Sequence, residues 1–596
     1  MQGIRQTDSL LARRRIGAAL SAVALIAATT VLATPARAAD ASMEVATEAD
    51  LQAAIALANG GEDVTATVVD DIAVTSGLAA LTDGSLTLLD DGDGHTISGD
   101  GDDFGNWPLI AAAGDVTLTI QGLSFDVADV TSVVMANGWS ADEFPTVTIA
   151  EVMILADGQS GGVSITNGSL IVSDLTVEGS SGGVFAQTEY GTVSLTDVVV
   201  TGSSGCGVAA EVAGSVSFTA SGLGISGAEC SGIGLVMQGD SSVSITDSYL
   251  SGNQGGLEIM NLSTGTALIA DSTIVGSNAA PQLEAFAYAG SIIVSSTTIS
   301  GGRDIGAPHV IAIIEDGGFT LEHSTVTDNA VSGGIPVVAI GGCGCESGGS
   351  ASVQHTIIAG NVGTSNDSPD FEIGEGFPRA IDWSLVGIID IDDDPTLEAL
   401  IAGTGTRFGL GEPIDPKLAP LALNGGMIPN HLPAPDSPAV NTGDPDFAGP
   451  PDTDQRGAAR ISAAIIDIGS VEVQFDPVLS VARSSVAVGE QVTVTGTGFP
   501  PDLTLDMVLN SDPVTLGTAV TAADGTLSFG FTVPSTIPVG EHTITAVVDD
   551  RVLSSVALTV TGLPDSGLDV GPLTAIGGLC LLLGFGAVLL ARRRFA

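Results

Sequence analysis

The segment VSITDSYLSGN, residues 243–253, is one copy of a phrase that recurs ten times between about Leu118 and Asn361. In each copy an apolar residue is followed two positions later by a second and seven positions later by a third, as in Val243, Ile245 and Leu250. An offset of two is the period of a β-strand, so the first two side chains share a face. The odd offset to the third residue requires a bend before it.

The copies follow one another at intervals of 23 to 32 residues. A unit of this size cannot bury its apolar face alone, so successive units must stack. Aromatic residues make up only 4% of the chain, and the copies are rich in Val, Ile, Thr and Ser, which favours β-strands. We therefore predict an all-β chain whose main body is a right-handed parallel β-helix of about ten or more coils.

Several polar residues have defined places in this repeat. We expect the bends at Ser173, Asp197, Asp247, Asp271 and Ser296, and one stacked inner column made of Val172, Leu195, Phe218, Ile245, Ile269, Val294, Leu321 and Val353. Asn253, Asn329 and Asn361 each follow the third apolar residue by three, which fits either an internal Asn ladder or simple turns. His323 and His355 occupy nearly equivalent bends, and we expect both to be exposed.

Five cysteines in 596 residues are too few for a disulfide scaffold. Cys206 and Cys230 are 24 positions apart, close to one coil, so adjacent coils would bring them together. Whether they pair is left open at this point.

The chain is strongly acidic, with a formal net charge of −54 from 16 basic and 70 acidic residues. Half of the basic residues lie near the two ends, at Arg5, Arg13, Arg14, Arg15, Arg37, Arg592, Arg593 and Arg594, and Lys417 is the only lysine. Such a surface repels nucleic acid, so no nucleic-acid partner is expected.

Residues 90–103, DDGDGHTISGDGDD, are rich in aspartate. We interpret the segment as a solvated turn between coils, because no Glu continues it into an EF-hand loop. Calcium binding is the alternative, with Asp90, Asp91, Asp93, Asp100, Asp102 and Asp103 as ligands. No other cofactor is expected.

The N-terminal 98 residues contain three predicted parts. Residues 1–38 have a basic region, an apolar run and a small-x-small site at Ala36 and Ala38, which is typical of a cleaved secretory signal peptide. Residues 46–59 predict an amphipathic helix with Thr47 as N-cap, which covers the first coil. Residues 64–98 form the opening strands, so the capped β-helix extends over residues 39–420.

Residues 421–476 contain an ordered set of motifs: Asn424-Gly425-Gly426, Ser437-Pro438-Ala439, Gly443-Asp444, Thr453-Asp454-Gln455-Arg456-Gly457 and Asp467-Ile468-Gly469. This segment resembles the choice-of-anchor Q domain of bacterial surface β-helix proteins. The resemblance implies a capping segment that closes the β-helix, with Asp454, Gln455, Arg456, Gly457 and Asp467 as its motif. Because Arg is scarce here, we expect Arg456 and Asp454 to form a buried or half-buried pair; a catalytic Asp–Arg pair is the alternative.

Residues 477–561 form a separate unit of about seven short alternating strands, which predicts a β-sandwich. The stretch from Gly489 to Phe499 resembles the GxxVTVxGxGF start of bacterial immunoglobulin-like modules. That resemblance implies an immunoglobulin-like spacer.

Residues 562–596 have the three-part order of a sortase cell-wall sorting signal. Leu563, Pro564, Asp565, Ser566 and Gly567 resemble its LPXTG motif with Ser in place of Thr. An apolar run at 573–591 follows and predicts a C-terminal transmembrane helix, and Arg592, Arg593 and Arg594 form a basic tail. The resemblance implies sortase and peptidoglycan as partners; a plain transmembrane anchor is the alternative.

These parts predict a secreted, cell-wall-anchored adhesin or stalk outside a Gram-positive cell, actinobacterial in type. The alternative is a β-helix that binds or degrades polysaccharide. Arg303 is the only basic residue of the array apart from its histidines, and no G-x-S-x-G, H-E-x-x-H or P-loop motif occurs, so we expect no catalytic activity. A cluster of two or three carboxylates with an aromatic side chain in a groove would favour the enzyme. Trp107, Trp139 and Trp383 are the aromatic candidates, and we expect each of them to be packed.

Overall fold

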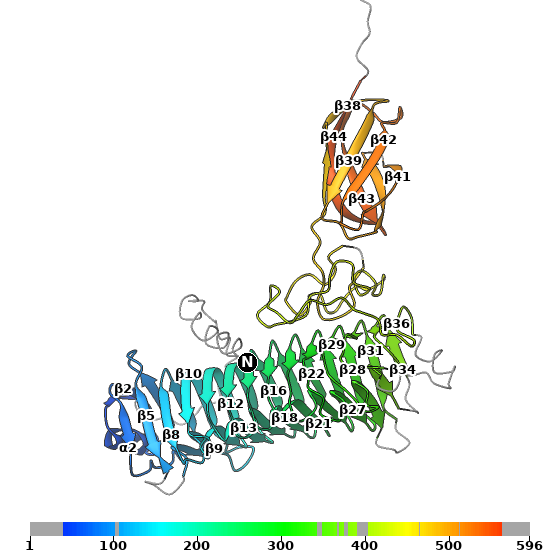
Figure 1. The fold of residues 1–596 in the computed structure, drawn as a ribbon. Helices are drawn as coiled ribbons and strands as arrows, with labels where there is room; N and C mark the ends of the chain where they lie inside the picture. Colours follow the sequence, from blue (N-terminus) through cyan, green and yellow to red (C-terminus); the bar gives the residue numbers. More distant parts are fainter. Residues whose placement is uncertain are drawn as a thin grey trace, which may run out of the picture. The chain divides into compact units, whose positions relative to one another are not determined.

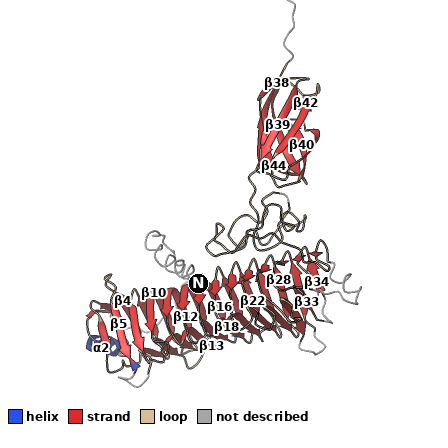
Figure 2. Cartoon of the chain, in the orientation of Figure 1, coloured by secondary structure: helices blue, strands red, loops and turns tan. Residues whose placement is uncertain are grey.

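The computed structural model describes residues 40–101, 107–342, 348–365, 369–374, 379–389, 403–463, 465–511 and 513–562. Its main body is a parallel β-solenoid of about 13 coils, which confirms the predicted β-helix (Figure 1). Strands account for nearly all of the regular structure, as Figure 2 shows. The inner face of the solenoid holds one continuous apolar core, so each coil buries its apolar side chains against its neighbours.

Most coils present three strands, which stack into three faces of parallel strands; face three has no strand in the first and last coils that the structure describes. Face one consists of β1 (Ala41–Val45), β2 (Asp63–Val68), β4 (Ser85–Asp90), β7 (Thr117–Gln121), the first halves of β10 (Thr146–Ala156), β12 (Ser169–Glu178) and β14 (Thr192–Thr201), then β16 (Ser217–Ser221), β19 (Ser242–Thr246), β22 (Thr266–Ala270), β25 (Ser291–Ser295), β28 (Gly318–Glu322), β31 (Ser350–Gln354) and β34 (Arg379–Asp382).

Face two consists of β3 (Ile72–Val74), β5 (Thr96–Asp100), β8 (Ser124–Ala128), the second halves of β10, β12 and β14, then β17 (Gly224–Ser226), β20 (Tyr249–Ser251), β23 (Thr273–Val275), β26 (Thr298–Ser300), β29 (Thr325–Thr327), β32 (Ile357–Ile358), β35 (Leu385–Val386) and β36 (Arg407–Phe408). Face three consists of β6 (Ile110–Ala113), β9 (Val134–Asn137), β11 (Gly161–Thr166), β13 (Gly182–Thr188), β15 (Val208–Val212), β18 (Ser231–Met237), β21 (Gly255–Asn261), β24 (Leu283–Ala287), β27 (Val310–Ile314), β30 (Val338–Gly342) and β33 (Phe371–Ile373).

The predicted N-terminal helix is present as α2 (Glu48–Ala58). The Thr47 side chain accepts a hydrogen bond from the backbone N–H of Asp50, which is the expected N-cap. The helix buries Leu51, Ala54, Ile55 and Ala58 against the strands of the first coils. Strand β1 precedes it and pairs with β2, so the solenoid begins before the helix rather than after it.

The bend between faces one and two has a left-handed backbone in coil after coil. Its non-glycine residues have φ between 46° and 56°; they are Glu151, Asp174, Asp197, Asp247, Asp271, Ser296, His323, His355 and Trp383, and we call them the corner column. Asp and similar short polar residues tolerate this conformation better than branched ones. The bend in the third copy is therefore Asp174, because Ser173 still pairs within the strand.

The inner column agrees with the prediction except at one coil. The register runs from Val172 to Leu195 and then to Ala220, Ile245 and Ile269. Phe218 instead lies in the neighbouring inner column, opposite Val193 and Val243. The error is a slip of two residues, which leaves every side chain on its correct face, so the apolar pattern alone does not detect it.

Hydroxyl side chains replace apolar ones at one inner position of the later coils. They are Ser248, Ser272, Thr297, Ser324, Thr356 and Ser384, and each side chain donates to the carbonyl two residues earlier. Several also accept a backbone N–H from the adjacent coil, as Ser324 does from Thr297. In this hydroxyl ladder every buried hydroxyl has a hydrogen-bond partner, so polar side chains can occupy an inner position that apolar side chains fill in the earlier coils.

The asparagine ladder exists in part. The side chain of Asn329 donates to that of Asn361 over 3.2 Å, and the two lie on adjacent coils. Asn253 is buried, and its side chain bonds the backbone of the preceding coil: it accepts the N–H of Ala228 and donates to the carbonyl of Ile225. The disulfide Cys206–Cys230 is present and joins adjacent coils.

Residues 477–562 form two packed sheets, as expected for a β-sandwich. One sheet contains β37 (Val478–Val481), β39 (Gln491–Thr497) and β42 (Leu527–Thr532), and the other contains β38 (Ser485–Ala487), β44 (Arg551–Thr561), β43 (Gly540–Val548), β40 (Thr504–Asn510) and β41 (Val514–Val520). Their inner residues form a separate apolar core. The eight strands exceed the predicted seven by one.

Several predicted features lie outside the described residues. They are the leader with Ala36 and Ala38, the aspartates 102 and 103, the motif at 563–567 and the apolar run at 573–591. Among the residues that the structure does describe, no helix is long and apolar enough to cross a membrane.

Candidate functional site

Residues 421–476, which we call the cover segment, pack on the outside of face two. Ala439 and Ile468 of the segment share a small apolar core with Ile357, Ala359 and Leu385 of the solenoid. The contacts described below extend from β32 back to β23, so the segment covers the side of successive coils. This differs from the closing of the solenoid's end that the family resemblance implied.

The covered strands are buried on both sides. The outward residues Thr298 and Ser300 of β26 and Thr325 and Thr327 of β29 are at most 4% exposed. On an earlier coil of the same face, where no cover is present, the outward residue Val199 is 38% exposed. The outward hydroxyls of the covered coils therefore need hydrogen-bond partners, and the cover segment supplies them.

Gln455 is the main polar link between the cover segment and the solenoid. Its Nε2 donates to the carbonyl of Ser272 and to Oγ1 of Thr273, each over 2.8 Å, and its Oε1 accepts from the Thr298 hydroxyl over 2.6 Å. The backbone N–H of Ser470 donates to the Thr325 hydroxyl over 2.9 Å. Together these bonds connect the segment to three consecutive coils.

His431 provides a second link. Its Nδ1 lies 2.8 Å from the carbonyl of Ala419, and its Nε2 lies 2.7 Å from the Ser300 hydroxyl. Because a carbonyl only accepts, Nδ1 carries the proton and Nε2 accepts from Ser300. Burial lowers the pKa of His431, so the neutral ring is favoured.

Arg456 and Asp454 form an ion pair inside the cover segment. Arg456 Nη2 lies 2.7 Å from Asp454 Oδ2, and the two side chains are 9% and 0% exposed. The guanidinium also donates to the carbonyl of Asn424, while Asp454 accepts the backbone N–H groups of Ala458 and Glu472. The pair therefore joins three stretches of a segment that contains no named strand.

Asp467 and Glu472 are two further buried side chains of the cover segment, and both are carboxylates. Asp467 accepts the backbone N–H groups of Asn441 and Val473, and Glu472 accepts those of Ser462 and Asp467. Burial raises the pKa of Asp467 to about 7 and that of Glu472 well above its usual value. The two carboxylates thus organise backbone turns, and their burial disfavours the charged forms.

Two histidines of the corner column face the cover segment. His323 and His355 stack with ring centroids 4.7 Å apart, and Phe447 meets both rings edge-on. The prediction of equivalent positions is correct, but the predicted exposure is wrong, because the two residues are 3% and 5% exposed. Residues of the cover segment bury them, although these residues follow far along the chain: Asp444 bonds His355 from 89 positions away, and Arg460 bonds His323 from 137 positions away.

Arg460 is the charged group that meets these rings. Its side chain is 1% exposed, and its Nη2 donates to His323 Nδ1 over 3.0 Å and to the carbonyl of Gly469. Burial and the Arg460 charge lower the pKa of His323 to about 2 and that of His355 to about 4. Both imidazoles are therefore neutral at physiological pH.

Asp271 belongs to the corner column, two coils before His323, and charged groups of the cover segment also shift its pKa. Burial and the charges of Asp247 and Asp454 raise the pKa of Asp271 to about 6, although Arg460 opposes the shift. The site thus contains two arginines, several carboxylates with raised pKa values and three histidines with lowered pKa values. This arrangement is suited to holding the cover segment in place on the solenoid.

The sequence identified only part of this site. The structure brings together Asp454, Gln455, Arg456 and Asp467, and Gly457 makes the turn after Arg456 with φ of 80°. Sequence reasoning missed Arg460, Glu472 and His431 and misjudged the two corner histidines. The scarcity of Arg that pointed to Arg456 applies equally to Arg460.

The structure gives little support to calcium binding by residues 90–103. Asp90 and Asp91 approach His95, with one candidate ligand atom from each residue within 4.8 Å of the others. Both Asp90 oxygens accept backbone N–H groups of the loop, from Gly92, Gly94 and His95. Calcium takes six to eight oxygen ligands, and the described residues here supply two carboxylates and an imidazole, so they do not fit that ion.

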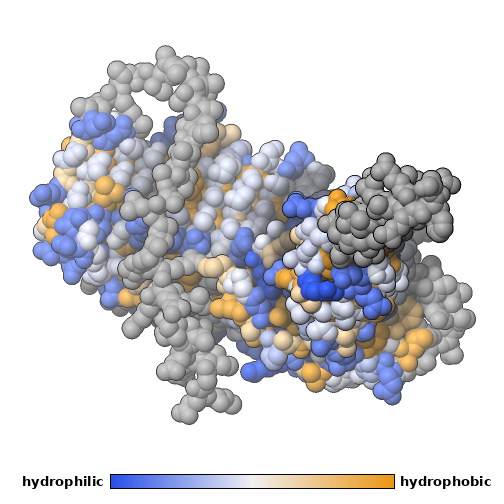
Figure 3. All heavy atoms as spheres, turned by 90° about the horizontal axis from the view of Figure 1, so that it is seen from above, coloured by the Kyte–Doolittle hydropathy of each residue, from blue (hydrophilic) through white to orange (hydrophobic). Residues whose placement is uncertain are grey.

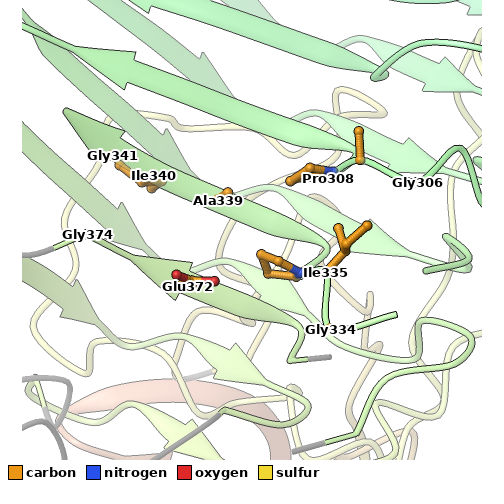
Figure 4. Close-up of a pocket in the computed structure, with 11 residues that line it drawn as sticks. Gly306, Pro308, Gly334, Ile335, Ala339, Ile340, Gly341, Glu372 and Gly374 are labelled. Carbon is orange, nitrogen blue, oxygen red and sulfur yellow. The ribbon is translucent and has the colours of Figure 1, made fainter. Parts of the chain in front are cut away.

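A shallow hollow of about 400 Å³ lies on the outside of face three (Figure 4). It is lined by the turns at 306–308 and 334–336 and by β30 and β33, and Glu372 is the ionisable residue among the described residues of its lining. Elsewhere on the solenoid, Trp107 and Trp139 are 69% and 66% exposed, which corrects the expectation that both are packed.

No protein-family model matches this chain, and no curated protein matches it. The fold and the site are thus described from the chain itself.

Proposed function

We propose that this protein is exported and attached to the cell wall of a Gram-positive bacterium, where the solenoid acts as a stalk or adhesive body. The proposal rests mainly on the order of sequence signals: a leader at 1–38, the LPXTG-like motif at 563–567, the apolar run at 573–591 and the three C-terminal arginines. In such an order the leader sends the chain outward and the apolar run stops it in the membrane.

Two structural observations support this proposal. The disulfide Cys206–Cys230 fits an oxidising extracellular compartment. The motif that resembles a choice-of-anchor Q segment is folded as one unit against the solenoid, with its Arg456–Asp454 pair at its centre. The β-sandwich at 477–562, which resembles an immunoglobulin-like module, then serves as the spacer between the solenoid and the wall.

The chemistry of attachment is a transpeptidation. A sortase cysteine attacks the carbonyl of Ser566, the bond to Gly567 breaks, and a peptidoglycan amine then takes the Ser566 acyl group. A proline restricts its own φ and disfavours a helical conformation at the residue before it, and Pro564 brings this preference for an extended substrate to the sortase groove. The product ends at Ser566 and leaves the cell with wall fragments after muramidase digestion.

The test is mass spectrometry of the mature protein, with two variants in the motif. Pro564→Ala is expected to abolish release by muramidase, whereas Asp565→Ala, at the variable position of the motif, is expected to preserve it. Intact peptides from 573–591 in the mature protein, together with extraction by detergent, would establish a plain transmembrane anchor instead.

Glycan binding is a second candidate function, and the exposed Trp107 and Trp139 favour it, because sugar rings pack on aromatic faces. On the face of the molecule seen in Figure 3, apolar residues otherwise occur in small groups among polar ones. A glycan array probed with the full chain tests this candidate. Binding that Trp139→Ala abolishes and Val199→Ala preserves would support it. We expect no release of sugar from pectin or alginate, and its detection would make the solenoid an enzyme.

A further inference from the structure

The outward side of face one carries a regular array of hydroxyl groups. From β4 to β25 each strand of this face points three side chains outward, and consecutive strands pair without a shift in register (Figure 1). The outward side chains therefore form three columns that run along the solenoid. Every member of the first column has a hydroxyl group: Ser85, Thr117, Thr146, Ser169, Thr192, Ser217, Ser242, Thr266 and Ser291.

The other two columns combine hydroxyls with a few aliphatic side chains and one amide. The middle column consists of Thr87, Thr119, Thr148, Ile171, Ser194, Thr219, Ser244, Leu268 and Ile293. The third column consists of Leu89, Gln121, Ala150, Ser173, Thr196, Ser221, Thr246, Ala270 and Ser295. Sheet geometry separates neighbouring positions by about 4.8 Å across the strands and by about 6.6 Å along each strand. We call these three columns the hydroxyl array.

The hydroxyl array contains no charged side chain, although the chain has a formal net charge of −54. Over the same coils, face three points Glu211 and Glu258 outward. Acidic residues begin at the corner column, where Asp197 and Asp247 border the third column of the array. Charged side chains favour solubility, so their exclusion from one face of a strongly acidic protein indicates a neutral ligand for that face.

Most hydroxyls of the array are available to a ligand. Those with a hydrogen-bond partner in the described part of the chain are Ser85, Ser169, Thr219, Ser221 and Ser295. The contacts that Thr219 and Ser221 donate are 3.4 Å long and therefore weak. A hydroxyl both donates and accepts, so each free group can bond a water molecule in either orientation.

The composition of the array does not fit the common kinds of macromolecular partner. Protein interfaces are enriched in aromatic residues, Met and Arg and depleted in Ser, whereas the array contains none of the former and many serines. A membrane surface would require Lys or Arg beside large apolar side chains. Sugar rings pack on aromatic faces, and the exposed Trp107 and Trp139 lie outside the array.

We propose that the hydroxyl array binds the surface of ice. Ice is a neutral ligand whose oxygen atoms repeat in two directions at intervals of a few ångström, as the side chains of this array do. The hydroxyls can occupy places of water molecules at the ice surface, because they donate and accept as those molecules do. A charged side chain would instead keep its own shell of oriented water. This inference goes beyond cell-wall attachment and does not depend on it.

The test measures how much protein a slowly growing body of ice takes up from a dilute solution of the full chain. Wild type should enter the ice, whereas a protein that does not bind ice stays in the liquid. Thr148→Lys combined with Thr219→Lys places two charges on the middle column and should abolish uptake. Thr166→Lys combined with Ala209→Lys is the matched control, because it adds the same charge at outward positions of face three and should preserve uptake.

Thermal hysteresis of the wild-type solution is the second measurement, and it requires no variant. We expect the wild type to lower the freezing point below the melting point. Exclusion of folded wild type from ice, or equal loss of uptake in the two variant pairs, would overturn the proposal. Binding of the wild type to microcrystalline cellulose or chitin without uptake by ice would assign the array to a crystalline polysaccharide and would also overturn it.

Discussion

The Nε2 atom of Gln455 donates a hydrogen bond to Oγ1 of Thr273 over 2.8 Å, although the two residues are 182 positions apart in the sequence. Both partners are buried. The contact shows that the cover segment reaches back along face two to β23, over coils that precede it by a large stretch of chain. The stability of this lateral packing leads to several predictions.

Replacing Gln455 with Met should loosen the cover segment by about 1–3 kcal/mol, because buried groups on Ser272, Thr273 and Thr298 each lose one of their hydrogen bonds. The measurement is hydrogen exchange of peptides from 421–476. Gln474→Met is the matched control: Gln474 is exposed and bonds only carbonyls of its own segment, at Ala459 and Glu472, so its loss should change exchange much less. Equal exchange in the two variants would contradict the role assigned to Gln455.

Replacing Arg456 with Met should cost about 3–5 kcal/mol, because Asp454 is left as a buried, unpaired charge. The expected readout is faster proteolysis of residues 421–476 at neutral pH, with the solenoid still folded. Lys417→Met breaks the solvent-exposed pair with Asp436 and serves as the comparison, since exposed pairs contribute little. Proteolysis of both variants at the wild-type rate would refute this prediction.

The Asp271 carboxyl should make stability depend on pH. Burial and the charges of Asp247 and Asp454 raise the pKa of Asp271 to about 6 in the folded state. As the pH rises from about 4, this carboxyl therefore loses its proton in the unfolded chain before it does so in the folded one. The free energy of unfolding falls over this interval, until about pH 6. Asp271→Asn removes this loss. After allowance for partial exposure, the variant should gain about 1–2 kcal/mol over the wild type at pH 8 and little at pH 4.

Urea unfolding at the two pH values measures this gain, and Asp174→Asn, at an exposed corner of an earlier coil, is the control. A stabilisation by Asp271→Asn that is larger at pH 4 than at pH 8 would have the wrong sign.

Replacing Ile245 with Asp should destabilise the solenoid by several kcal/mol. Ile245 is 1% exposed and lies between Ala220 and Ile269 in the inner column, so the new charge would be buried without a partner. Ser242→Asp, three residues earlier on the exposed side, should be nearly neutral. Circular dichroism during thermal unfolding separates the two outcomes, and equal midpoints would show that the register is wrong.

Removing the disulfide with Cys206→Ser should cost about 2–4 kcal/mol, as is usual for a bond that closes a loop of this length. The separation of 24 residues corresponds to one coil. Denaturant unfolding of the wild type with and without reductant gives the same quantity independently. A wild type that reductant does not destabilise would contradict the prediction.

The strand period and the repeat interval determined the solenoid from sequence alone. Leu118, Ile120 and their counterparts alternate with polar residues, and alternation of period two specifies which side chains face the core. The same alternation could not detect the slip at Phe218, because a shift of two preserves both faces. The helix after Thr47 was also predictable, since its cap and its apolar face are local.

Only the tertiary structure decided where residues 421–476 lie and what they bury. The sequence contained Arg456, Asp454 and Gln455 as a motif, but the partners of Gln455 on the solenoid are separated from it by more than one hundred positions. The same packing turned His323 and His355 from expected surface residues into a neutral stacked pair beside Arg460. Local periodicity fixes the direction of a side chain within its coil, whereas its burial, its pKa and its partners depend on which distant segment packs against that coil.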